Sequence, residues 1–307
     1  MEHIPLLGLG TVQHYTQKGA ITQKILDAFD IGYRHIDTAT NYGTTDEVRE
    51  AIRRLKVPRK EYWVTVKLSS GARSLKEVQE AVQSFGLEYA DLVLLHYGCG
   101  TAKSLAVLEE AQRVGLARHI GTSNCYELPK TKGPGPGIYA NQIELHPYAP
   151  EMEIMKMYNS AGVGIIAYAP LATGAVGLLE ILAPEKIAEI KDKYDFNSYA
   201  DMFLLWNIQR MKEMSSAYDI HNSTLTGASS RSNLEKNYNL AYHNDIVFTP
   251  AEMKTMSCLS RWVFCDEYQH FTTANPALYH RKGSRTGCGD EGPCSRLDTA
   301  DLFDMLS

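Results

Sequence analysis

Tyr33-Arg34-His35-Ile36-Asp37 is a short strand-like run that ends on an aspartate, and the same plan recurs three more times in the first half of the chain. Each run ends on a residue that can carry or donate a proton. The other three runs are Tyr62–Lys67, Asp91–His96 and Ala117–Asn124, which closes on Ser123 and Asn124. These ends lie roughly 30 residues apart, and the ends of parallel barrel strands meet on one rim. We therefore expect an active site assembled from distant parts of the chain.

Strand and helix signals alternate over most of the sequence, which sets the fold class. Further strand-like runs lie at residues 4–9, 138–142, 163–169 and 225–228. Between the runs, apolar residues recur at helical spacing, as at Ile21, Ile25 and Ala28. Eight strands separated by helices predict an α/β protein of the (β/α)8 TIM-barrel type. We expect one barrel domain over residues 1–280 and a C-terminal tail or loop at 281–307.

The glycine pattern argues against a doubly wound sheet, whose dinucleotide turn reads Gly-x-Gly-x-x-Gly before a helix. Gly8-Leu9-Gly10-Thr11 lacks the third glycine, and no helix pattern follows at once. Residues 133–137 alternate glycine with proline, which predicts a loop. Two helix starts have capping-box spacing, Ser74-Leu75-Lys76-Glu77 and Thr249-Pro250-Ala251-Glu252. The second predicts a late helix from about residue 250.

The composition of the 307-residue chain is globular, with 44% hydrophobic and 22% charged residues. The net charge of −5 argues against a nucleic-acid-binding protein, which usually carries excess positive charge. No apolar run approaches the roughly 18 to 20 residues that span a bilayer, and the first residues lack a secretory-signal pattern. We expect a cytoplasmic protein that binds neither nucleic acid nor membranes. The oligomeric state stays open.

Six cysteines are too few for a disulfide scaffold in a chain of this length. Four lie in otherwise ordinary segments, and these are Cys99, Cys125, Cys258 and Cys265. Cys288 and Cys294 lie close together in the Gly-rich tail, where a disulfide or a metal is the alternative to two thiols. We expect two thiols there, and no metal at the active site.

Tyr42 lies five residues beyond Asp37, in the loop that follows the same predicted strand. Its hydroxyl is a further candidate for proton transfer, besides Asp37, Lys67 and His96. A tyrosine alone, with a pKa near 10, is a poor acid at neutral pH. A nearby ammonium would stabilise its phenolate, and an aspartate could hold that ammonium in place. Lys67 and Asp37 suit those tasks, and His96 could orient or polarise a carbonyl. A surface charge or a satisfied polar residue explains each alone, but not all four at barrel strand ends.

These residues lie in segments that resemble the signatures of a known superfamily. The segments are Gly32–Ala39 with Tyr42-Gly43, Ile120–Asn124, Asn141–Pro147 and Ala167–Leu171. Together they look like the aldo-keto reductases, and the likeness covers roughly residues 4–260. The resemblance implies a (β/α)8 barrel and NAD(P)H-dependent reduction of a small-molecule carbonyl.

The resemblance also implies a role for each position. Tyr42 would be the general acid that protonates the carbonyl oxygen. Lys67 would lower the pKa of Tyr42, Asp37 would pair with Lys67, and His96 would orient the carbonyl. For the cofactor, the resemblance implies that Ser123, Asn124 and Gln142 hydrogen-bond the nicotinamide carboxamide and that Tyr168 stacks beneath the nicotinamide ring. It places Leu171 and Thr173 along the pyrophosphate and Thr11 near the inner ribose. At the adenosine end, the implied contacts are Ser229, Arg231 and Asn237.

The likeness fails in the segment that should hold the 2′-phosphate of NADPH. Gly227 stands where the family has a lysine, and Asn233 stands where it has an arginine. Arg231 or Lys236 could supply substitute positive charge, since a phosphate needs cations rather than fixed positions for them. We expect NADPH as the cofactor, with NADH as the alternative.

Three other departures concern the substrate side of the rim. Tyr97-Gly98 replaces an expected Trp-Pro, and the loop at residues 99–102 is very short, which predicts an open substrate site. Residues 211–222 look like an insertion before the last strand. The leading hypothesis is reduction of an aldehyde or ketone. The alternatives are NAD-dependent oxidation of an alcohol at the same site, and a catalytically weak barrel that only binds the cofactor.

Overall fold

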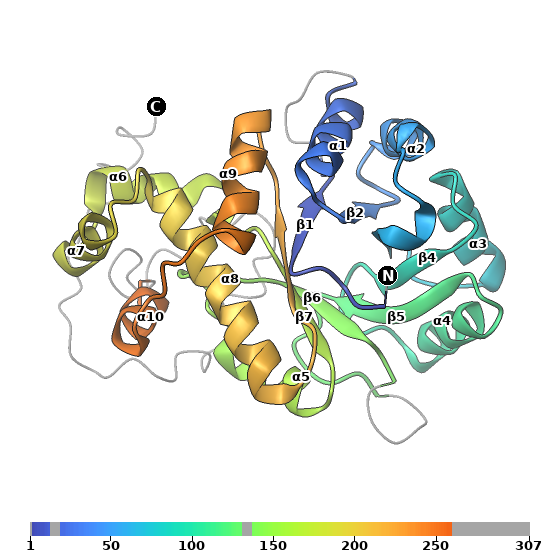
Figure 1. Ribbon diagram of the computed structural model, residues 1–307. Helices are drawn as coiled ribbons and strands as arrows, with labels where there is room; N and C mark the ends of the chain where they lie inside the picture. The colour runs from blue at the N-terminus through green and yellow to red at the C-terminus, as the bar shows by residue number, and fades with distance from the viewer. Residues whose placement is uncertain (1, 13–18, 131–136, 260–307) are drawn as a thin grey trace, which may run out of the picture.

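The computed structural model describes residues 2–12, 19–130 and 137–259. They form a closed barrel of eight parallel strands with helices on its outside (Figure 1). The strands follow one another around the barrel in chain order, and β8 closes it by pairing with β1. The predicted (β/α)8 TIM barrel is therefore confirmed. The expected domain end at 280, the tail at 281–307 with its two cysteines, and most of the Gly-Pro loop lie outside the described residues.

Every barrel strand is short, and its residues are almost all buried. The strands are β1 (Leu7–Gly10), β2 (His35–Ala39), β3 (Trp63–Leu68), β4 (Ala90–Leu95), β5 (Ala117–Ser123), β6 (Ala140–Glu144), β7 (Gly164–Tyr168) and β8 (Ser223–Thr226). Parallel strands covered on their outer face by helices and filled on their inner face by side chains are expected to be apolar on both faces.

Within the described residues, helices or helical turns connect successive strands except β5 and β6. The helices are α1 (Ala20–Ile31), α2 (Thr45–Arg54), α3 (Leu75–Ser84), α4 (Ala102–Arg113), α5 (Met152–Ser160), α6 (Leu179–Leu182), α7 (Glu185–Lys193), α8 (Tyr199–Tyr218), α9 (Arg231–Tyr242) and α10 (Pro250–Ser257), with 3-10 turns η1 (Arg59–Glu61) and η2 (Ala172–Leu178). The predicted capping box at Thr249 is confirmed, because Thr249 and Glu252 exchange both bonds. At α3 only half of the box forms, since Glu77 turns back to the amide of Arg73 instead.

Strand alternation decides which side chains point into the barrel. Leu92 and Leu94 on β4 pack with Trp63, Ile166 and Leu225 in a small apolar cluster, whereas the odd-numbered β4 residues Val93 and Leu95 belong to the larger core shared with the helices. The first cluster is therefore the filling of the barrel, because successive strand residues face opposite sides. Counting on in steps of two along the strands, the same inner face carries Asp37, Lys67, His96, Ser123, Gln142 and Tyr168.

Two strand boundaries and one segment differ from the sequence-based expectations. β1 begins at Leu7 rather than near residue 4, and β8 covers 223–226 rather than 225–228. Residues 211–218, which resemble an insertion in the sequence, are the last turns of the continuous helix α8. The apolar residues Met211 and Met214 bury the inner side of that extension, so packing against the barrel explains its helical form.

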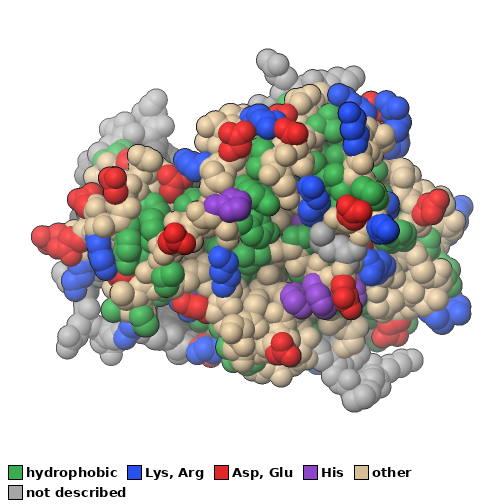
Figure 2. Space-filling model, viewed as in Figure 1, with side chains coloured by type: hydrophobic (Ala, Val, Ile, Leu, Met, Phe, Trp, Pro, Cys, Tyr) green, Lys and Arg blue, Asp and Glu red, His purple; other side chains and the backbone are tan. Residues whose placement is uncertain are grey.

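The charges of the surface are mixed. Figure 2 shows acidic and basic side chains interspersed over the face in view, without a large area of one sign. Among residues 2–12, 19–130 and 137–259, each helix is too short or too polar to cross a membrane.

Candidate active site

Three buried side chains from β2, β3 and β6 form a closed polar triangle at the rim. The Lys67 ammonium donates to Oδ1 of Asp37 and, over 2.9 Å, to Oε1 of Gln142. Nε2 of Gln142 donates to Oδ2 of Asp37 over 2.7 Å. Each residue is at most 2% exposed. A charge buried this far from water is tolerated when it is paired and hydrogen-bonded, and the triangle meets that condition.

The pKa of Lys67 reflects this arrangement. Burial by itself lowers the pKa of the ammonium, but the Asp37 carboxylate and the Tyr42 hydroxyl outweigh burial and raise it above its ordinary value. Lys67 therefore stays charged at neutral pH, and it places a fixed positive charge in the barrel mouth.

Tyr42 follows β2 in the loop before α2, and its ring lies beside the triangle. The Lys67 Nζ atom is 4.9 Å from the centre of the Tyr42 ring. Burial raises the pKa of Tyr42, and Lys67 opposes that rise without reversing it. Lys67 thus acts in the predicted direction, but the net shift is upward, opposite to the sequence-based expectation. Tyr42 rests in the phenol form, which can donate a proton.

His96 completes the group from the end of β4. Its ring meets that of Tyr42 edge to face at 5.6 Å and stacks on Tyr97 at 4.4 Å. Burial and the charge of Lys67 lower the pKa of His96 to about 4, so the imidazole is neutral at physiological pH. Its Nδ1 atom has no hydrogen-bond partner within the described part of the chain. A neutral imidazole has one N–H to donate, which suits it to a carbonyl oxygen.

The neighbouring strand ends form a second hydrogen-bonded group. The Tyr168 hydroxyl donates to Oδ1 of Asn124 over 2.8 Å. Nδ2 of Asn124 donates over 3.1 Å to the carbonyl oxygen of His96 and over 3.3 Å to Oγ of Ser123. Asn124 has a φ of 58°, a left-handed conformation that asparagine accepts better than most residues. The two groups of the rim are therefore joined at His96.

The side chain of Gln142 lies in the polar triangle, while its backbone carbonyl oxygen accepts from the amide of Asn124 over 2.8 Å. The side-chain oxygen of Gln142 accepts from Lys67, and one side-chain N–H donates to Asp37. The second side-chain N–H is left for a ligand. Thr11 is buried, and both its backbone amide and its hydroxyl donate over 3.0 Å to the carbonyl oxygen of Asp37. These bonds fasten the end of β1 to β2, and the ribose contact that the resemblance implies for Thr11 stays a prediction.

The loop after β7 has an unusual backbone. Ala172, Thr173 and Gly174 have successive φ values of 53°, 52° and 98°. Left-handed residues beside right-handed ones bring backbone N–H groups together, and such loops often bind anions. Leu171 and Thr173, the predicted pyrophosphate contacts, lie in this loop, so its conformation fits a phosphate-bearing cofactor.

A cavity of about 400 Å³ opens beside His96, between the loop after β3 and the start of α4. Its polar and charged lining includes Ser69, Ser70, Arg73, Tyr97, Thr101 and Lys103. The short loop at 99–102 contributes one wall. This position makes the cavity a candidate space for the part of a substrate beyond its reacting carbon.

Comparison with known proteins settles the family. A model described as the aldo/keto reductase family matches residues 6–260. The chain belongs to this family. It is 30% identical over 302 residues to an aldo/keto reductase of Synechocystis, covering 85% of this chain and 86% of the relative. It is 30% identical over 248 residues to a methylglyoxal reductase of Escherichia coli O157:H7, covering 76% and 86%.

Solved structures agree with this assignment. An aldo-keto reductase from a deep-sea metagenome of the Medee basin superimposes with a TM-score of 0.68 at 25% identity, covering 86% of this chain and 94% of that one. The chain is therefore an oxidoreductase of the aldo-keto reductase family, whose members in general reduce carbonyl compounds with NAD(P)H.

At the predicted adenosine end of this aldo-keto reductase, the charged side chains are exposed and paired on the surface, unlike the buried pair at the rim. Arg231 donates over 2.6 Å to Asp30 and over 3.0 Å to Glu235, and a further contact of 3.4 Å reaches Asp27. Lys236 pairs with Asp201 over 2.9 Å. Both cations proposed as substitutes for the missing clamp are thus directed to carboxylates. The structure does not bring them together as a phosphate site.

The remaining predicted residues of this end lie around the start of α9. Ser230 caps the helix, and the Ser229 hydroxyl accepts from Nδ2 of Asn233 over 3.0 Å. Asn237 is buried, and its Nδ2 lies 3.5 Å from the carbonyl oxygen of Gly227. Gly227 itself has open space around the position of a Cβ atom.

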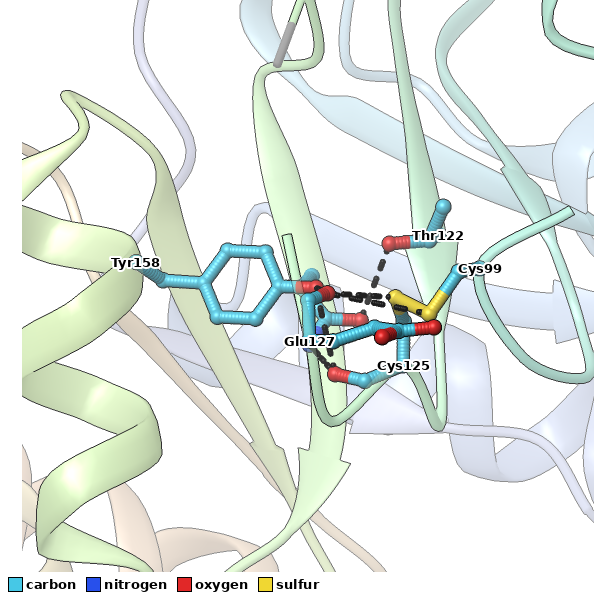
Figure 3. The surroundings of a disulfide bond; sticks show 6 residues. Cys99, Thr122, Cys125, Glu127 and Tyr158 are labelled. Atoms are coloured by element: carbon cyan, nitrogen blue, oxygen red, sulfur yellow. Dashed lines mark hydrogen bonds between the residues drawn. A yellow bond between two sulfur atoms is a disulfide. The ribbon is translucent and has the colours of Figure 1, made fainter. Parts of the chain in front are cut away.

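One feature of the rim has no counterpart in the sequence-based expectations. Cys99 and Cys125, assigned to ordinary segments, form a disulfide between the loop after β4 and the segment after β5 (Figure 3). They are 26 residues apart. In the sequence, each cysteine closely follows a predicted strand end. The two cysteines come within bonding distance only because β4 and β5 are neighbours in the closed barrel.

Proposed function

We propose that this aldo-keto reductase reduces an aldehyde or ketone to an alcohol with a reduced nicotinamide cofactor, and that Tyr42 is the general acid. The observation that carries the proposal is the buried Lys67–Asp37 pair next to the Tyr42 ring, with neutral His96 in edge-to-face contact with the same ring. Four groups from β2, the β2–α2 loop, β3 and β4 thus surround one point at the barrel mouth.

The roles of Tyr42, His96 and Lys67 in proton transfer follow from the negative charge that would develop on the carbonyl oxygen. A bound reduced nicotinamide would supply hydride to the carbonyl carbon, and negative charge would develop on the carbonyl oxygen. The Tyr42 hydroxyl would give its proton to that oxygen, and the His96 N–H would donate a hydrogen bond to it. The charge left on Tyr42 would be stabilised by Lys67, which Asp37 and Gln142 hold in place.

At neutral pH the raised pKa keeps Tyr42 in the protonated form that a general acid for carbonyl reduction needs. Burial is the main cause of the shift. Alcohol oxidation would need Tyr42 to accept a proton, which would require a more alkaline solution. We therefore infer that Tyr42 acts as an acid for carbonyl reduction at neutral pH.

The cofactor site is supported by the Ser123–Asn124–Tyr168 group and by the left-handed loop after β7. The adenosine end gives less support to NADPH, the cofactor that the family generally uses. Arg231 is surrounded by carboxylates of α1 and α9 that would repel a 2′-phosphate. We infer that the protein binds NADH about as tightly as it binds NADPH.

The direct test measures binding and turnover separately. Quenching of intrinsic fluorescence by NADPH and by NADH should give two dissociation constants within about tenfold of each other, because the described residues of the adenosine end include no buried cation that would select the phosphate. Reduction is then followed at 340 nm with a panel of aldehydes that starts with methylglyoxal, the substrate class named for the E. coli relative. Tight binding without turnover of any aldehyde would leave only the catalytically weak barrel, and absence of binding would exclude both readings.

A further inference from the structure

The disulfide Cys99–Cys125 connects the two functional groups of the rim at their boundary. Cys99 lies three residues after His96, and Cys125 directly follows Asn124. The Cα atoms of the two cysteines are 4.6 Å apart. One end of the bond thus belongs to the substrate-side loop, defined as Tyr97–Thr101, and the other end belongs to the segment that holds the proposed nicotinamide contacts.

Two hydrogen bonds also join the same two segments close to the cysteines. The amide of Gly98 donates to the carbonyl oxygen of Ser123 over 2.8 Å. The side chain of Asn124 donates to the carbonyl oxygen of His96 over 3.1 Å. The disulfide is the third connection and the only covalent one, so it limits how far the two segments can move apart.

The two ends of the disulfide are anchored unequally. Cys125 is fully buried, and its carbonyl oxygen accepts from Nδ2 of Asn141 over 2.7 Å and from the hydroxyl of Tyr158 over 3.1 Å. Tyr158 reaches it from α5 and also donates to the carbonyl oxygen of Glu127 over 2.6 Å (Figure 3). This end is part of the rigid scaffold.

Cys99 lies in a tight, glycine-flanked turn instead. It is half-buried and stands between Gly98 and Gly100, whose φ values of 76° and 73° are left-handed. Glycine adopts that conformation without a steric penalty, so the loop turns sharply on both sides of Cys99 with no side chain at either turn to anchor it. The disulfide therefore transfers the rigidity of the Cys125 side to the substrate-side loop.

We propose that Cys99 and Cys125 are positioning residues: their disulfide holds His96 and Tyr97 at the separation from Asn124 that hydride transfer requires. The inference rests on the proposed reductase function. Reacting groups must be held to well under 1 Å, and misplacement on that scale lowers rates strongly. Opening the bond leaves two hydrogen bonds to set the geometry, so the rim loosens without the barrel unfolding.

The chemistry of opening is thiol–disulfide exchange with a dithiol. A reductant thiolate attacks the Cys99 sulfur, which is the more accessible one, and the Cys125 sulfur leaves and takes up a proton. The second thiol of the reductant then releases Cys99 as a protonated thiol. The protein gains two electrons and two protons, and the reductant becomes a disulfide.

The test compares the full-length protein before and after treatment with dithiothreitol. Alkylation followed by mass measurement counts the thiols at Cys99 and Cys125, and circular dichroism confirms that the barrel stays folded. Single-turnover oxidation of NADPH by saturating aldehyde should become about tenfold slower once the bond is open. The Kd of NADPH should rise by about threefold, since Asn124 flanks one end of the bond. Because that Kd needs no turnover, it still tests the inference if the proposed reductase function fails.

Two variants control the experiment. Cys99→Ser should match the reduced wild type in rate and should not respond to dithiothreitol. Cys258 at the end of α10 is also disulfide-bonded, so dithiothreitol acts on it as well. Cys258→Ser removes that second bond and should keep both the wild-type rate and its response to the reductant. Unchanged rate and unchanged Kd in protein shown to carry both thiols would overturn the proposal. So would isolation of the protein with both thiols already free, or an equal response of Cys99→Ser to the reductant.

Discussion

The hydride end and the adenosine end of the proposed site differ in where their charges lie. At the hydride end, Lys67 and Asp37 are buried together and satisfied by Gln142. At the adenosine end, Arg231 is 45% exposed and spreads its contacts over three carboxylates. Buried pairs are expensive to break, whereas exposed pairs contribute little. The chemistry of this reductase is therefore rigidly specified, and its choice of cofactor is open to change by few substitutions.

The substitution expected to impair the hydride end most is Tyr42→Phe. Loss of the general acid should lower kcat for aldehyde reduction by about 10²–10⁴-fold. The Kd of NADPH should stay within about twofold of wild type, because the hydroxyl does not belong to the cofactor-binding group. Steady-state kinetics and fluorescence quenching check the two values, and retained turnover would reject Tyr42 as the acid.

Removing the cation tests the buried pair itself. Lys67→Met should lower the free energy of unfolding by about 3–5 kcal/mol, since it leaves the Asp37 charge buried without its partner. Urea denaturation measures the change.

Two comparisons sharpen this result. Adding Asp37→Asn to Lys67→Met should recover much of the loss, because no charge then remains uncompensated. The exposed pair Lys76–Glu80 offers the matched control, and Lys76→Met should change stability by less than about 1 kcal/mol. Equal effects of the two single substitutions would contradict the difference between buried and exposed charges.

The adenosine end should respond to a gain of charge. Gly227→Lys with Asn233→Arg adds two cations where the family usually has them, and Gly227 has room for a side chain. The Kd of NADPH should fall by about tenfold, while that of NADH should change by less than about twofold, because only NADPH has the 2′-phosphate. Gly227→Gln with Asn233→Gln is the neutral control. A parallel gain for both cofactors would show that the added side chains act on something other than the phosphate.

A further expected effect is the pH dependence that His96 contributes. Its pKa is lowered to about 4 in the folded state, against 6.5 ordinarily. As the pH falls from 6.5 toward 4, the unfolded chain takes up a proton that the folded chain refuses, so folding stability decreases. One proton gives a slope of at most about 1.4 kcal/mol per pH unit.

His96→Gln should flatten this part of the stability curve. Denaturation at several pH values between 7 and 4.5 measures the difference between the two proteins. His35, whose pKa burial lowers to about 3, is present in both and cancels. An identical slope in the variant would mean that His96 titrates normally.

Much of the fold and of the hydride end is predictable from the sequence, for a local reason. Period-two alternation along each strand fixes which side chains share a face, so Asp37, Lys67 and His96 point inward wherever the barrel closes. The predicted ends of β1 and β8 are displaced because short apolar runs do not show where pairing begins. The upward shift of the pKa of Tyr42 also escaped prediction, since it depends on burial that no local pattern reports.

Strand periodicity and residue type at strand ends predicted the (β/α)8 barrel and the candidate residues of its proton chemistry, and the resemblance to the aldo-keto reductases predicted carbonyl reduction. Three contacts emerge only from the folded chain: Gln142 supports Lys67 and Asp37, Arg231 faces the carboxylates of α1, and Cys99 is bonded to Cys125. Each of these contacts joins residues that are 26 to 204 positions apart. Such pairs come within reach of each other only when the barrel closes, so no local pattern encodes them.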